Sequence, residues 1–89
     1  MARFEMPDIE SAVLGQSPAT ADSFYQLGIN YSIGNNVPTD YVSAHKWFNL
    51  AAMRGNKDAI RHRQEIAASM SPAEIAQAQR AARIWLKSH

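Results

Sequence analysis

Apolar residues recur every three or four positions along most of this chain, which is the spacing of one face of an α-helix. The clearest run lies between two sets of helix-end signals. Ser17 and Pro18 suit an N-cap and a first turn, and Gly34-Asn35-Asn36 suits a helix end because both residue types accept a positive φ. The pattern predicts a helix between Pro18 and Gly34 with one apolar face: Ala21, Phe24, Leu27, Gly28 and Tyr31.

A second run predicts a helix that starts near Thr39 or Asp40 and ends at Gly55-Asn56. Asp40 is expected to act as a cap, where its charge suits the helix dipole, and to have no acid–base role. Gly28 has no side chain, so we expect it at the crossing of the two helices, against Ala44 or Phe48. The apolar face of this helix is Ala44, Trp47, Phe48, Ala51 and Ala52.

Two further helices are predicted towards the C-terminus. With the short N-terminal helix counted as the first, the fourth helix runs from about Lys57 to Ser69. The fifth helix runs from the capping box Ser71-Pro72-Ala73-Glu74 to the end of the sequence. The inward residues of the fourth are Ala59, Ile60, Ile66, Ala67 and Met70; those of the fifth are Ile75, Ala78, Ala82, Trp85 and Leu86. Residues 1–17 form a separate N-terminal segment, in which a short helix at 7–14 is favoured.

These elements predict an all-α fold in a single small domain of 89 residues. There is no cysteine, so neither a disulfide nor a thiolate metal site stabilises it. Residues 1–53 carry two basic and five acidic groups, whereas residues 54–89 carry seven basic and three acidic ones. This asymmetry favours head-to-tail contacts or an anionic partner, unless it is ordinary surface scatter. No apolar run is long enough for a membrane span and no secretory leader is evident, so a cytoplasmic location is expected.

Catalytic chemistry is not indicated. His45, His62 and His89 lack the paired ligand spacing of a helical metal site, apart from the weak pair His62 and Glu65, and all three are expected at the surface. No nucleophile elbow and no Gly-rich phosphate loop occurs. We therefore expect no enzyme, no cofactor and no metal. Trp47 and Trp85 lie within apolar stripes and are expected in the core.

The two helices predicted between Pro18 and Asn56 carry a more specific pattern. Phe24-x-x-Leu27-Gly28-x-x-Tyr31 followed by Ala44-x-x-x-Phe48 is typical of a tetratricopeptide-like helix-turn-helix unit. With 13 positions from Tyr31 to Ala44, and with Val37-Pro38, Trp47-Phe48 and Ala51-Ala52 in place, residues 21–59 resemble one Sel-one-like repeat (SLR). Ser23 and Asn36 depart from the family pattern, and Arg63-Gln64 stands where a second repeat would have Leu-Gly.

The resemblance implies an antiparallel α/α hairpin repeat, with a full repeat at 21–55 and a degenerate capping hairpin at 56–88. Residues 18–89 would then form one domain, similar to the capped ends of bacterial members of the family. Such units stack on neighbours and offer a groove to a partner. One complete repeat is fewer than an array normally needs, so the chain is either a minimal capped domain or a protomer that completes its core by dimerising.

A second stripe on the first repeat helix would face this groove. Tyr25, Ile29 and Ile33 follow one another at intervals of four, and Arg61 and Glu65 are the matching positions on the fourth helix. The alternative is that the stripe packs beneath the N-terminal segment through Ile9, Val13 and Leu14.

We expect a protein–protein interaction or adaptor module that binds a peptide or a helix, with no membrane contact. One alternative is a nucleic-acid-binding regulator, which is less favoured because no exposed aromatic residues accompany the basic ones. Its candidate phosphate contacts are Arg61, Arg63, Arg80, Arg83 and Lys87. The other alternative is a purely structural homo-oligomer.

Overall fold

The computed structural model describes Ile9, Glu10 and residues 20–89, and within these residues the chain is helical with no strand. The all-α class predicted from the sequence is confirmed. The helices are α2 (Ala21–Ile33), α3 (Tyr41–Met53), α4 (Lys57–Ala67) and α5 (Pro72–Ser88). Ile9 and Glu10 also have helical backbone, whereas the rest of the helix expected at 7–14 lies outside the described residues.

Helix α2 begins later than its sequence signals indicated. Its N-cap is Thr20, whose side chain accepts a hydrogen bond from the Ser23 backbone N–H at 3.2 Å. The Ser23 hydroxyl oxygen in turn accepts from the Thr20 backbone N–H at 2.9 Å, so the two residues form a capping box. This reciprocal pair satisfies two backbone donors at the start of the helix. Ser17 and Pro18 lie outside the described residues.

The turn between α2 and α3 follows the expected chemistry. Gly34 ends α2 in the left-handed conformation with φ 74°, and Asn36 also has a positive φ of 67°. Asp40 caps α3, because its carboxylate accepts from the Ser43 backbone N–H at 3.1 Å. The Asp40 backbone N–H donates to the Tyr31 carbonyl at 3.0 Å, which ties the end of the turn back to α2.

The ends of α4 and α5 are also set by local caps. Asn56 caps α4 by accepting from the Ala59 N–H at 2.9 Å. The helix ends at Ala67, two residues before the expected end at Ser69. At α5, Ser71 and Glu74 form the predicted capping box.

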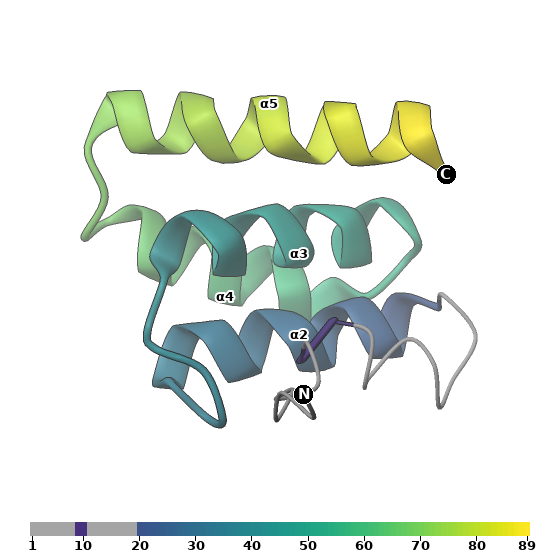
Figure 1. Ribbon diagram of the computed structural model, residues 1–89, viewed down its shortest axis with the longest axis horizontal. Coiled ribbons are helices and arrows are strands. Elements are labelled where there is room, and N and C mark those ends of the chain that lie inside the picture. Colours follow the sequence, from purple (N-terminus) through teal and green to yellow (C-terminus); the bar gives the residue numbers. More distant parts are fainter. Residues whose placement is uncertain (1–8, 11–19) are drawn as a thin grey trace, which may run out of the picture.

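Helix α3 lies at the centre of the arrangement. It packs against α2, α4 and α5, whereas α4 and α5 contact each other little. Successive helices run in opposite directions, with α2 and α5 on two sides of α3 and α4 behind it (Figure 1). A helix covered on three sides must be apolar over most of its circumference. This accounts for the burial of Leu50, which is 1% exposed although it lies outside the expected apolar stripe.

The core is built mainly from aromatic and aliphatic residues of α2 and α3. The largest fully buried side chains are Trp47, Phe24, Phe48, Leu27 and Leu50. Two residues expected to face inward are instead exposed: Ile60 by 39% and Leu86 by 37%. Each directly follows a residue that packs in or against the core, Ala59 and Trp85, so its side chain points about 100° away from that residue around the helix.

Candidate partner-binding surface

The proposed groove residues lie on α2 and α4, and Tyr25 links the two helices. Its ring centre lies 5.8 Å from that of Phe48 on α3 and 5.5 Å from that of His62 on α4. His62 also stacks on Phe48, with ring centres 5.4 Å apart and planes 19° apart. Tyr25 is therefore half-buried between its own helix and α4, and its position is fixed by aromatic packing.

The stripe Tyr25, Ile29 and Ile33 runs from the core to the solvent. Tyr25 and Ile29 are partly buried and pack against the core. Ile33 is 66% exposed, the largest exposed fraction among the exposed large apolar side chains of the described residues. Of the three, Ile33 offers most of its surface to a partner.

Arg61 and Glu65 on α4 are both exposed and each has a local partner. Glu65 lies 3.6 Å from the Nδ1 atom of His62, so the structure brings it close to Tyr25 through that histidine. Arg61 lies 3.6 Å from Asp58, one turn earlier on α4. Exposed pairs of this kind contribute little to stability, so both side chains can exchange partners at low cost.

His45 is buried, which contradicts the surface position expected for all three histidines. It is 3% exposed, and no hydrogen-bond partner of its Nδ1 atom is found in the described part of the chain. Burial lowers the pKa of His45 below its usual 6.5, and the nearby positive charge of Arg63 lowers it further. His62 is half-buried, and only His89 is exposed, where it stacks on Trp85 with ring centres 4.2 Å apart. The expectation failed because α3 is covered on three sides.

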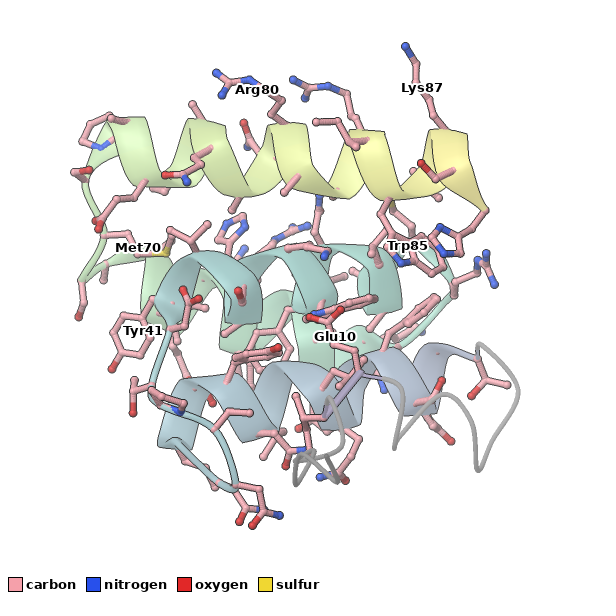
Figure 2. The ribbon with its side chains drawn as sticks, viewed as in Figure 1. Glu10, Tyr41, Met70, Arg80, Trp85 and Lys87 are labelled. Carbon is pink, nitrogen blue, oxygen red and sulfur yellow. The ribbon has the colours of Figure 1, made fainter. Side chains whose placement is uncertain are left out.

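The basic residues of the C-terminal half differ in how far they are exposed to a phosphate ligand. The Arg63 guanidinium donates to the Asn49 side-chain oxygen at 2.6 Å and is only partly exposed. Arg80, Arg83 and Lys87 are exposed on α5, and Figure 2 shows Arg80 and Lys87 pointing away from α3. A phosphate-binding surface would therefore have to be built without Arg63.

Glu10 makes a contact that the sequence did not indicate. Its Oε2 atom accepts a hydrogen bond from the Tyr31 hydroxyl at 2.8 Å and another from the Trp47 indole N–H at 3.3 Å. Glu10 lies on the viewer's side of the α2–α3 pair, whereas α4 lies behind it (Figures 1 and 2). Buried Tyr and Trp polar groups normally find a partner, and that requirement was the available signal. Val13 and Leu14, the other proposed contacts of the N-terminal segment, lie outside the described residues.

The structure describes residues 9–10 and 20–89, and two other kinds of site are absent from these residues. No group of three or more His, Asp or Glu side chains in this part of the chain could hold a metal ion. None of its helices is both long and apolar enough to cross a membrane. The cytoplasmic location stays a prediction from the sequence.

The resemblance to the Sel-one-like repeat rests on the residues of this chain alone. A scan against protein-family models finds no match, and searches of curated proteins and of solved structures find none either.

Proposed function

We propose that this chain is a protein–protein interaction module of the Sel-one-like repeat kind, with α2 and α3 as an antiparallel repeat hairpin and α4 and α5 as its cap. Support comes from the residues that define the repeat. Tyr31 packs against the core, Ala44 is fully buried, and Gly28 approaches the Phe48 ring closely. The backbone bond from Asp40 to Tyr31 closes the long turn between the two helices.

The exposure of Ile33 carries the functional proposal. A β-branched apolar side chain that is 66% exposed contributes little to folding, yet Tyr25 and Ile29 of the same stripe are held by the core. The stripe thus presents one free apolar side chain beside two fixed ones. Fixed neighbours lose little conformational freedom on binding, which favours the capture of a partner. A few such anchors normally provide most of the binding free energy.

The partner that fits this surface is a peptide or helix with an apolar face and charged flanks. The apolar face would cover Ile33 and the exposed edges of Tyr25 and Ile29. Glu65 and Arg61 are exposed charged residues of α4, and in this proposal they pair with residues of opposite charge at the rim, where they favour specificity and association rate.

The test uses one exposed isoleucine against another. Full-length Ile33→Asp and Ile84→Asp chains carry the same change in charge and size, at positions that are 66% and 57% exposed. Each is used as bait in source-cell extract, and captured proteins are quantified by mass spectrometry against the wild-type chain. We expect the Ile33→Asp chain to capture at least about tenfold less of a specific partner than the wild-type chain does. This loss corresponds to about 1.4 kcal/mol of binding free energy. Ile84→Asp should retain that partner.

Two other results would replace this proposal. The nucleic-acid regulator would be favoured if Ile33→Asp and Ile84→Asp captured equal amounts of partner protein and if an Arg83→Ser/Lys87→Ser chain lost a nucleic-acid ligand that the wild-type chain binds. A steep salt dependence of that binding would support the same conclusion. A structural homo-oligomer would be favoured by a third set of results. The purified chain would sediment in a concentration-dependent way, the Ile33→Asp chain would not, and no other ligand would be captured.

A further inference from the structure

Two hydrogen-bond donors from different helices converge on one carboxylate oxygen at the side of the α2–α3 pair opposite α4. The Tyr31 hydroxyl of α2 and the Trp47 indole N–H of α3 both donate to the Oε2 atom of Glu10, at 2.8 Å and 3.3 Å. Glu10 is 21 residues from Tyr31 and 37 from Trp47 along the sequence. The convergence is therefore a feature of the folded helices and not of a local turn.

The donors are held in place by the core rather than by Glu10. The Trp47 ring is fully buried, stacks on Phe24 with ring centres 5.6 Å apart, and meets the edge of Trp85 at the same distance. Tyr31 lies on α2 and packs against the same cluster. Both donors are thus oriented before any acceptor arrives, and preorganised donors bind an acceptor at a small entropic cost.

A positive charge and an aliphatic side chain both lie close to this cluster. The Lys46 ammonium lies 4.3 Å from the centre of the Trp47 ring, so a positive charge flanks the donor that Glu10 uses. Hydrogen bonds to an ionised acceptor are about twice as strong as neutral ones. Ile9, the residue directly before Glu10, packs against the core. Two adjacent side chains, one aliphatic and one anionic, therefore occupy this face together.

We propose that the face formed by Tyr31, Trp47 and the adjoining core is a recognition site for a short segment of a partner protein in which an aliphatic residue directly precedes a carboxylate. The chain's own Ile9-Glu10 occupies the site and competes with that segment. This site is separate from the candidate partner-binding surface, because Tyr25 of that surface contacts His62 on α4 and because Glu10 and α4 lie on opposite sides of the α2–α3 pair (Figures 1 and 2). The inference therefore does not depend on the proposed function.

The site is tested by vacating it within the full-length chain. In an Ile9→Ser/Glu10→Ala chain, a blocked synthetic peptide with the sequence of residues 4–15 should bind and should shift the Trp47 indole N–H resonance. The signal is assigned with a Trp85→Phe chain, since the protein has two tryptophans. A tethered segment competes at an effective concentration in the millimolar range, so the wild-type chain should bind the peptide at least about tenfold more weakly.

Two controls are matched to these changes. A peptide with serine and alanine in place of its isoleucine and glutamate should not bind. An Ile60→Ser/Asp58→Ala chain loses the same kinds of side chain at an exposed place on α4, and it should bind the peptide as weakly as wild type does. Equal binding of the native and substituted peptides would overturn the proposal. So would a folded Ile9→Ser/Glu10→Ala chain that does not bind the native peptide.

If that double variant does not fold, Glu10→Gln decides the question, because it removes the charge and keeps the shape. We expect its Trp47 indole resonance to move clearly more than that of Trp85, and an unchanged Trp47 resonance would overturn the proposal. Sedimentation tests whether the segment in the site comes from a second copy of the same chain. A wild-type dimer that is lost in Glu10→Gln would show that a second copy supplies the segment, which would overturn recognition of an outside partner.

Discussion

Gly28 of α2 packs directly against the Phe48 ring of α3, and a methyl group added at Gly28 would overlap with that ring. A Cβ atom at this position would stand 2.4 Å from Cδ1 and 2.5 Å from Cε1 of Phe48. Both distances are far below ordinary van der Waals contact. The Gly28→Ala change therefore forces either the Phe48 ring or the two helices apart.

The cost follows from how firmly Phe48 is held. Its ring is fully buried and packs against both His62 and Tyr25, so it cannot rotate into solvent. Overpacking of such a site costs about 1–3 kcal/mol, and we place this one near the upper end. Replacing a mid-helix glycine by alanine returns about 1 kcal/mol of helix propensity. The expected net loss in the free energy of unfolding is about 1–2 kcal/mol.

Thermal and urea unfolding measure this loss directly. For a domain of this size the melting temperature should fall by about 4–16 °C. The matched control is the double variant Gly28→Ala/Phe48→Leu, in which the smaller side chain makes room for the methyl group. Its loss should be clearly less than the sum of the two single losses. A Gly28→Ala chain as stable as wild type, or more stable, would show that Gly28 and the Phe48 ring do not approach this closely.

The remaining predictions concern α5 and His45. Trp85 packs on both Phe24 and Trp47, so Trp85→Ala should lower the free energy of unfolding in urea by about 3 kcal/mol. Leu86→Ala, at an exposed neighbouring position, should lower it much less. Equal losses would show that Trp85 does not pack into the core. The folded chain disfavours protonation of His45, so stability should fall as the pH drops through and below about 6.5, until the folded-state pKa is passed. His45→Gln should flatten this pH dependence, and an unchanged slope between pH 7 and pH 5 would contradict the assignment.

Most helix ends could be predicted from the sequence because their causes are local, but the start of α2 and the end of α4 were not. The caps at Asp40 and at Ser71 join residues only three positions apart, and Gly34 needs only its own backbone freedom. The approach of Gly28 to Phe48 was also predictable, since a missing side chain in an apolar stripe indicates a close helix crossing. Thr20 was missed because Ser17-Pro18 offered an equally good local signal.

The features that the sequence did not reveal depend on which helix covers which. His45 is buried because α3 has neighbours on three sides, whereas an amphipathic pattern alone implies one covered face. The bond from Glu10 to Trp47 joins residues 37 positions apart, and nothing near either residue specifies the other. On the candidate surface, the apolar pattern predicted the stripe of Tyr25, Ile29 and Ile33. It could not show that Tyr25 and Ile29 pack against the core whereas Ile33 is exposed.

The central position of α3 has a consequence for how the domain opens. Since α4 and α5 each rest on α3 and touch each other little, α5 can separate without breaking the packing of α2 and α4 on the central helix. Partial opening of this kind proceeds as a cooperative unit of its own, below the free energy of global unfolding. Backbone amides of α5 would then exchange with solvent hydrogen before those of α3, because α3 is released only when its interfaces with α2, α4 and α5 are all lost.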